Sequence, residues 1–330
     1  MRVFFVTALS GLVVSEPLGR GDKLRNNDFV TNEPGAFEIH LDEAFRAGAG
    51  GLETEFILSS PTVVYAMDTL PDDADVQKYL VSKMLDLAAF LTSLWLIKDN
   101  AIDHGMLYAS YPRGGGQCTE SNYRATRLSR SSGDHEAVVY TRKELADARR
   151  LLRTHFGSYD FIPTSSAAAV QKGTRVARAL YFISAARADS DLGLKIANYC
   201  SALEALFGTA TSELTHLLAE RVSVFLEEDP DPRIQIYQAV RRSYALRSSV
   251  IHGSQIKASK ADTLRDAAKT LDDALRLALF KSASDTIRRG LLESTDALID
   301  ASFLRILMGC SWDDVGAMLD QRPPDDQGGG

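Results

Sequence analysis

The 330-residue sequence has few cysteines, no overall excess of basic residues and no long uninterrupted apolar run. Its three cysteines, Cys118, Cys200 and Cys310, lack the spacing of a metal site, so we expect no metal and reduced thiols in the cytoplasm. The net charge of -7 argues against a generally basic nucleic-acid-binding protein. No apolar run has the length of a membrane span, and we expect no membrane partner.

The first residues weakly resemble a signal peptide, because Arg2 precedes an apolar stretch that extends to Val14. Ser10 and Gly11 interrupt this stretch, only one positive charge precedes it, and no small-residue cleavage site follows. We therefore interpret it as two short strands, with secretion as the less favoured alternative.

The composition, 45% hydrophobic and 25% charged, is typical of a soluble globular protein, and the length suggests two domains. We predict an α+β protein: a mixed α/β domain over residues 1–158, an all-helical bundle over 159–322, and a disordered tail over 323–330. The domain boundary is expected near residues 157–164, where Pro163 and a serine-rich segment follow a helix end.

In the first domain, β-forming residues and apolar alternation predict strands at residues 3–7, 12–14, 37–41, 52–58, 62–66, 107–111 and 122–128. Helical spacing predicts a long helix over 73–100, and a capping box at Thr141 and Glu144 predicts another over 141–155. The triple glycine 114–116 lacks the Lys and Ser/Thr of a phosphate-binding loop, which favours a flexible hairpin loop.

The second domain is helical in pattern nearly to its end. We predict helices over residues 165–188, 191–208, 212–228, 232–251, 260–283 and 284–308, and a short final helix capped by Ser311. The segment Asp229-Pro230-Asp231-Pro232 ends one helix and begins the next.

One pair of residues in this domain has the types needed for acid–base chemistry on a phosphate. Arg247 and His252 are separated by four residues. Similar spacings occur elsewhere by chance, between Arg130 and His135 and between Arg149 or Arg150 and His155. The Arg247 match differs in context, because a helical run with Tyr244 precedes it, Gly253 follows it, and the helical segment Leu203-Glu204-Ala205-Leu206-Phe207 lies upstream.

With this context, residues 165–290 resemble the HEPN family, most closely its Apea-like branch, whose members often act as RNA-cutting defence or toxin effectors. The resemblance implies a metal-independent endoribonuclease without a cofactor, in which the RNA 2′-hydroxyl attacks the adjacent phosphate and leaves a 2′,3′-cyclic phosphate. It also implies a homodimer in which the paired motifs face each other. The mixed strands and helices of residues 1–158 suggest a sensing or regulatory domain, as in similar defence proteins, and its expected partner is a phage or cellular trigger.

The resemblance also implies residue roles. His252 would act in proton transfer, Arg247 would hold the phosphate, and Glu204 would orient Arg247. Tyr244, Ser248 and Ser249 would support the site. Ser248 departs from the family pattern, in which Asn, Asp or His often follows the arginine, and this departure puts activity in doubt.

Residues 233–289 contain 12 Lys or Arg against 5 Asp or Glu, a balance of +7, counted from the sequence. We expect this excess to meet RNA phosphates through Arg241, Arg242 and Lys257, although solvated helix faces would give the same count.

Two alternatives stay open at this stage. In one, the domain is a catalytically silent HEPN module for nucleic-acid or nucleotide binding or for dimerisation. In the other, the motif is purely structural: Arg247 pairs with Glu204, and His252 caps a helix that Gly253 ends. On a straight helix Arg247 and His252 lie about 140° apart, so either the helix deforms or His252 faces a cleft shared with a second copy. We interpret His40, His104 and His216 as ordinary residues, and Trp95 and Trp312 as core anchors.

Overall fold

The computed structural model describes residues 1–123, 127–154, 173–209, 214–251 and 261–320, with the side chains of 248–251 excepted. An antiparallel sheet in the N-terminal part is followed by helices, which confirms the α+β class. The chain divides into two compact units, Met1–Ser129 with His135–Ser158, and Arg130–Asp134 with Tyr159–Gly330. We describe each unit separately. The predicted boundary at residues 157–164, the tail 323–330 and the cap at Gly253 lie outside the described residues.

A seven-stranded antiparallel sheet is the centre of the first unit. Its strands within the described residues are β1 (Arg2–Ser10), β3 (Asp22–Lys23), β4 (Asp28–Thr31), β5 (Val63–Thr69), β6 (Asp103–His104), β7 (Leu107–Arg113) and β8 (Gly116–Asn122). Their order is β3-β4-β5-β1-β7-β8, and β6 pairs with the end of β1. Strand β1 is central, with Phe5 opposite Ala66 on one side and Ala109 on the other. Both of its faces are buried, so it is apolar along nearly its whole length.

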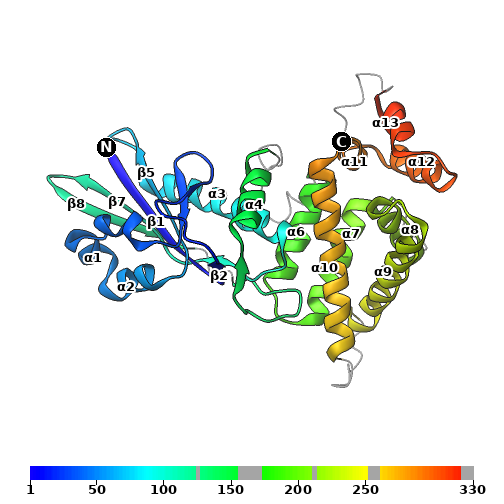
Figure 1. The fold of residues 1–330 in the computed structure, drawn as a ribbon, viewed down its shortest axis with the longest axis horizontal. Helices are drawn as coiled ribbons and strands as arrows, with labels where there is room; N and C mark the ends of the chain where they lie inside the picture. Colours follow the sequence, from blue (N-terminus) through cyan, green and yellow to red (C-terminus); the bar gives the residue numbers. More distant parts are fainter. Residues whose placement is uncertain (124–126, 155–172, 210–213, 252–260, 321–330) are drawn as a thin grey trace. The chain divides into compact units, whose positions relative to one another are not determined.

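Helices cover both faces of this sheet (Figure 1). The short helices α1 (Glu43–Ala49) and α2 (Gly51–Ser59) lie on the face that receives Phe4 and Val6, and the long helix α3 (Val76–Ile97) lies on the face that receives Phe5. The alternation of side chains along β1 therefore supplies two cores, one on each side of the sheet.

A small second sheet holds the last helix of this unit. Strands β2 (Leu12–Val14) and β9 (Val138–Tyr140) pair in parallel, and α4 (Arg142–Thr154) follows β9 directly. The predicted capping box is confirmed: the Glu144 backbone N–H donates to the Thr141 hydroxyl at 3.2 Å, and the Thr141 backbone N–H donates to the Glu144 carboxylate at 2.9 Å. The buried Tyr140 hydroxyl donates to the Leu94 carbonyl at 2.8 Å, which ties this sheet to α3.

A buried lysine joins α3 to the sheet. Lys83 forms ion pairs with Asp28 on β4 and with Asp68 on β5, the second at 2.7 Å, and the Tyr79 hydroxyl donates to Asp68 at 2.8 Å. One cation thus faces two carboxylates. Burial raises the pKa of Asp28 to about 6, and the attraction of Lys83 only partly opposes this shift.

Helix α3 is long and apolar enough, by length and composition, to cross a membrane. This corrects the expectation that no apolar run has that length. Most of its apolar window is buried within the protein, and Lys83 is part of the same window. We therefore interpret α3 as the core helix of the first unit.

Two predicted strands of the first unit were wrong. Residues 38–40 form the short 3-10 helix η2 (Glu38–His40), which follows η1 (Pro34–Ala36); the flanking Phe37 and Leu41 are buried and Ile39 is 79% exposed. Residues 52–58 form α2, which buries Thr54 and Ile57. In both segments the buried residues are three or four positions apart, so one helical turn places them on the same side.

The glycine segment was predicted correctly as a hairpin loop, but the second strand of the hairpin was placed wrongly. Strand β8 begins at Gly116, and Gly114 and Gly115 form the two-residue turn with φ values of +59° and +83°. Such a turn requires positive φ at both central residues, which glycine adopts without strain. The predicted strand 122–128 overlaps β8 only at Asn122, and residues 124–126 lie outside the described part.

The second unit is a bundle of helices. Within the described residues these are α6 (Arg175–Arg187), α7 (Leu192–Phe207), α8 (Leu214–Leu226), α9 (Pro230–Ile251), α10 (Ala261–Ser284), α11 (Thr286–Leu292), α12 (Asp296–Leu307) and α13 (Trp312–Asp320). Helix α7 packs against α6, α9 and α10, and α8 packs against α9 (Figure 1). The predicted cap at Ser311 is confirmed, because its hydroxyl accepts from the Asp314 backbone N–H at 3.2 Å.

The single helix predicted over 284–308 was wrong, because α11 and α12 are separate and turn at residues 293–295. Two buried arginines give the reason. Arg175 on α6 pairs with Asp296, and Arg221 on α8 pairs with Asp300. These ion pairs hold α12 against the bundle, which a straight continuation of α11 would prevent. The predicted helix 165–188 is described only from Arg175 onward.

Candidate functional site

The candidate site lies where α7 packs against α9. Helix α7 begins at Leu192 and is capped by Asp191, whose side chain accepts from the Leu194 backbone N–H at 2.9 Å. Its apolar residues Leu203, Leu206 and Phe207 are fully buried, and Glu204 lies at the edge of this buried face. The helical period therefore presents one carboxylate at the border between core and solvent.

Three predicted residues meet at this border. The Arg247 Nη1 donates to the Glu204 Oε1 and, at 2.8 Å, to the Tyr244 hydroxyl, while the Tyr244 hydroxyl donates to the same carboxylate oxygen. The guanidinium carbon of Arg247 also lies 5.6 Å from the centre of the Tyr244 ring. Tyr244 and Arg247 are three positions apart on α9, so one turn of helix aims both at Glu204.

Arg247 keeps part of its hydrogen-bonding capacity unused. Its side chain is 26% exposed and that of Glu204 is 25% exposed. Its Nε is buried and makes no hydrogen bond among the described residues. Both contacts to Glu204 and Tyr244 use Nη1, so a ligand oxygen would have to accept from the exposed part of the guanidinium and not from Nε.

The charge states of the cluster follow from its burial. Burial, together with the hydrogen bond to Glu204, raises the pKa of Tyr244, so the phenol keeps its proton at neutral pH. Burial lowers the pKa of Arg247, but the negative charge of Glu204 together with the interactions with Tyr244 and Cys200 outweighs this, and the net shift is upward. Arg247 is therefore a fixed cation held by one carboxylate and one neutral hydroxyl.

Cys200 lies one helical turn before Glu204 and is fully buried. Burial raises the pKa of its thiol, so it stays protonated and does not act as a nucleophile. From the sequence, Cys200 was expected only to be a reduced thiol. Its spacing of four from Glu204 on a predicted helix was the signal that placed it near the site.

The remaining predicted residues are distributed differently. Arg241 and Arg242 are exposed on α9, roughly 120° or more around the helix from Arg247, so the structure does not bring them to the cluster. Ser248 and Ser249 belong to α9, but their side chains lie outside the described residues. His252 and Lys257 also lie outside the described residues.

A buried polar network supports α7 from its other side. The Tyr199 hydroxyl donates to Asp272 on α10 at 2.9 Å, and Arg276 pairs with the same Asp272 at 2.9 Å. Both Tyr199 and Asp272 are fully buried. This network anchors α7 to α10 and so fixes the position of Glu204. Among the described residues, no cluster of His, Cys, Asp and Glu has the arrangement of a metal site.

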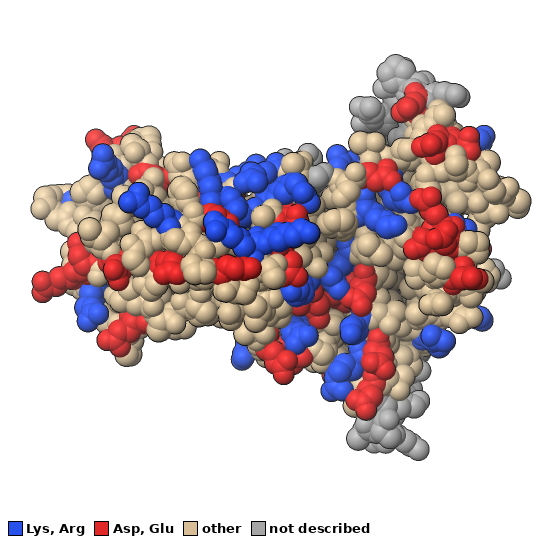
Figure 2. All heavy atoms as spheres, in the orientation of Figure 1, with Lys and Arg blue, Asp and Glu red and all other residues tan. Residues whose placement is uncertain are grey.

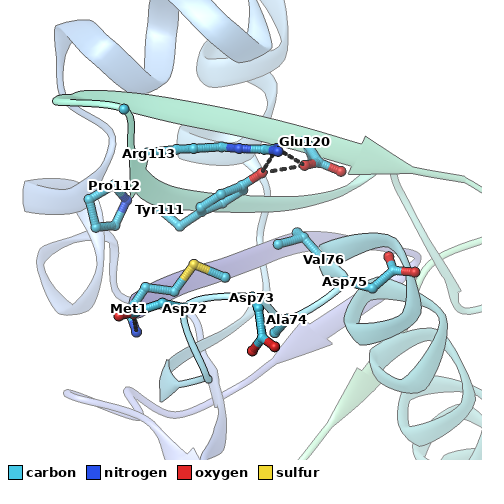
Figure 3. Close-up of a pocket in the computed structure, with 11 residues that line it drawn as sticks. Met1, Asp72, Asp73, Ala74, Asp75, Val76, Tyr111, Pro112, Arg113 and Glu120 are labelled. Carbon is cyan, nitrogen blue, oxygen red and sulfur yellow. Dashed lines mark hydrogen bonds and ion pairs between the residues drawn. The ribbon is translucent and has the colours of Figure 1, made fainter.

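The first unit has a separate pocket of about 550 Å³ beside the glycine hairpin (Figure 3). Asp72, Asp73, Asp75 and Glu120 line it, with Arg113 as its cationic side chain. The Tyr111 hydroxyl donates to Glu120, and Arg113 donates to Tyr111 at 3.4 Å. The excess of carboxylates disfavours a phosphate ligand, so this pocket is a poorer candidate for RNA than the α7–α9 cluster.

The histidines and tryptophans to which we assigned no functional role make contacts within the fold. His40 lies against Phe4, the His104 Nδ1 lies 2.8 Å from the Gly105 carbonyl oxygen, and His216 lies against Tyr237. Trp95 and Trp312 are both buried, as predicted for core anchors.

A scan against protein-family models, a search of curated proteins and a search of solved structures each found no match to the chain.

Proposed function

We propose that this protein is a metal-independent endoribonuclease of the HEPN type, with Arg247 and His252 as its catalytic residues. It cuts RNA to 2′,3′-cyclic phosphate ends and acts in the cytoplasm as a bacterial defence or toxin effector. The observation that carries the proposal is the cluster of Glu204, Tyr244 and Arg247, which holds a cationic fork five residues before His252.

The chemistry assigns one role to each group. Arg247 donates to the non-bridging oxygens of the scissile phosphate and stabilises the charge that develops when the 2′-hydroxyl attacks. Glu204 and Tyr244 are both contacted through Nη1, so we assign Nη2 to the phosphate. His252 acts in the proton transfer that accompanies attack of the 2′-hydroxyl on the phosphate, because an imidazole exchanges protons near neutral pH. No step requires a metal.

We also propose a homodimer. Helix α9 is described to Ile251, and on a straight helix two residues five positions apart, such as 247 and 252, would lie about 140° apart. We propose that the two motifs of a dimer face one another, so that the His252 of one copy completes a cleft with the second copy. The N-terminal unit then acts as the sensor of a phage or cellular trigger.

The alternative is a catalytically silent HEPN module that binds RNA or a nucleotide, or only dimerises. The pairing of Arg247 with Glu204 suits this role equally, since a guanidinium fixed by a carboxylate also stabilises a helix pair. Ser248 after the arginine favours this alternative. Cleavage of RNA by the purified protein decides between the two.

The test is cleavage of a labelled RNA by the full chain in the presence of a chelator, with the ends identified as cyclic phosphate. His252→Ala is expected to slow cutting by ~10²–10⁴-fold, because it removes the proton-transfer group. Arg247→Ala is expected to cause similar damage, and Arg247→Lys to restore little, because a point charge lacks the planar fork.

The matched control is His135→Ala. His135 follows Arg130 at the same spacing as His252 follows Arg247, and its replacement should leave cutting intact. Cutting that survives His252→Ala, or that stops when Mg²⁺ is chelated, would show that the assignment is wrong. Binding of RNA without any cutting by the wild-type chain would instead support the silent module.

A further inference from the structure

Helix α4 of the first unit carries basic residues in two stripes. Arg142, Arg149 and Arg153 lie at positions i, i+7 and i+11, within about 40° of one another around the helix. Lys143 and Arg150 form a second stripe beside them. In Figure 2 blue atoms gather over this helix and the neighbouring hairpin.

The neighbouring β3–β4 hairpin orders the first stripe. Arg149 pairs with Asp22 at 2.7 Å and donates from Nε to the Lys23 carbonyl at 2.8 Å, and Arg142 pairs with the same Asp22 at 3.3 Å. One carboxylate thus fixes two guanidinium groups. Segments 20–25 and 142–153 together contain 8 Lys or Arg and 3 Asp or Glu, a balance of +5 in a chain whose net charge is -7.

This arrangement of charge works against the helix that carries it. Arg142 and Lys143 occupy the first turn, where the positive end of the helix dipole disfavours a cation. Arg149 and Arg153 are like charges at i and i+4, which also destabilises a helix. Burial lowers the pKa of Arg149, and the charges of Arg153 and Arg142 lower it further. The ion pairs with Asp22 account for Arg142 and Arg149. The last turn suits Arg153, but the stability of α4 gives no reason for Lys143 in the first turn.

We propose that the basic face of α4, with the β3–β4 hairpin, binds the phosphate backbone of a nucleic acid. The basic residues extend over about 16 Å along the helix axis, from 11 residues at 1.5 Å each. With one phosphate per ~3.4 Å of axis in each strand, this length covers roughly five phosphates. The face has no aromatic residue on α4, so it reads charge and not base identity.

An anionic membrane is the competing partner for such a face, and the packing of α4 disfavours it. A helix that lies on a membrane inserts apolar side chains beside its basic ones. The apolar residues of α4, Leu145, Ala148, Leu151 and Leu152, are all buried inside the first unit. The exposed side offers only Ala146 between the two stripes, so nothing on α4 can enter the bilayer.

The test is binding of a fluorescent 20-nucleotide 2′-O-methyl RNA to the full chain, measured by anisotropy between 50 and 200 mM salt. This RNA has no free 2′-hydroxyl, so binding is measured without cleavage and stands independently of the proposed ribonuclease activity. The variant Lys143→Gln/Arg150→Gln/Arg153→Gln removes three exposed cations but keeps the Asp22 ion pairs. We expect it to weaken binding about tenfold or more and to reduce the salt slope by about 2.

The matched control, Arg2→Gln/Arg46→Gln/Lys78→Gln, removes three exposed cations of the same unit that are not on α4. It lowers the net charge by the same amount and should change the RNA affinity and the salt slope much less than the α4 variant does. The single variant Lys143→Gln keeps the proposal testable if the triple variant unfolds, with an expected slope change of about 0.7. A DNA strand of the same length should bind through the same residues. Unchanged RNA binding in the α4 variants, or binding to phosphatidylserine vesicles but not to RNA, would overturn the proposal.

Discussion

The buried cluster around Lys83 makes a prediction about pH whose size follows from the structure. Lys83 lies between Asp28 and Asp68, so one positive charge meets two negative ones in a buried site. Asp28 is the more buried carboxyl, and burial raises its pKa to about 6 from 3.8. Its folded-state pKa is thus above the unfolded value. The stability that its protonation contributes is complete at low pH and is lost as the pH rises through about 6.

The perturbation is Asp28→Asn, which keeps the shape of the side chain and mimics the protonated acid. For a shift from 3.8 to about 6, the wild-type free energy of unfolding should gain about 1 kcal/mol between pH 7 and pH 5 from this group alone. The asparagine side chain does not titrate, so the variant lacks this pH-dependent gain. We therefore expect the variant to be at least as stable as the wild type at pH 7, and its advantage to shrink by about 1 kcal/mol at pH 5.

The assay is urea unfolding followed by tryptophan fluorescence in a Trp312→Phe background. The chain has two tryptophans, so Trp95, buried in the first unit, then reports on that unit alone. The difference between variant and wild type cancels the titration of other groups. A difference that does not vary with pH, or that grows on acidification, would show that Asp28 behaves as a stabilising ion-pair partner with a lowered pKa.

Other parts of the structure make further predictions. Tyr244→Phe should cost about 1 kcal/mol in urea unfolding, because it removes one of the two hydrogen bonds donated to the Glu204 carboxylate, and an unchanged free energy would contradict the hydrogen bonds of the cluster. Cys200 should react with iodoacetamide only after unfolding, and fast reaction of the native protein would contradict a buried neutral thiol. Gly133→Ala should lower the melting temperature more than Gly19→Ala. Both glycines have positive φ, but only at Gly133 would a Cβ lie 2.7 Å from the Ser190 backbone oxygen. Equal losses would show that backbone strain alone sets the cost. Light scattering should give about twice the 36.1 kDa chain mass, and a strict monomer at high concentration would remove the composite cleft.

Long elements with one strong period could be predicted from the sequence by itself. The apolar run of β1, the helical spacing of α3 and the capping box of α4 specify those elements locally. The same holds for α7 to α10, whose observed bounds lie within a few residues of the predicted ones. In each case the apolar residues follow one period over several turns or residues, so tertiary contacts do not alter the type of element that forms.

Short segments were decided by tertiary structure. Residues 37–41 and 52–58 have the β-forming residues of strands, but each buries a pair of side chains three or four positions apart under the sheet. Five to seven residues fit both periods, so propensity cannot choose between them, and the position of the partner surface does. The break between α11 and α12 likewise depends on Arg175 and Arg221, which are more than 70 residues away in sequence from their partners.

The candidate site shows the same division. The spacing of Arg247 and His252, and the presence of Glu204 on an upstream helix, could be read from the sequence. Only the packing of α7 on α9 joins Glu204, Tyr244 and Arg247 through one carboxylate oxygen and leaves the Arg247 Nε without a hydrogen bond among the described residues. Residues 40 or more positions apart in the chain meet because both helices bury an apolar face against each other, and this burial is a property of the whole bundle.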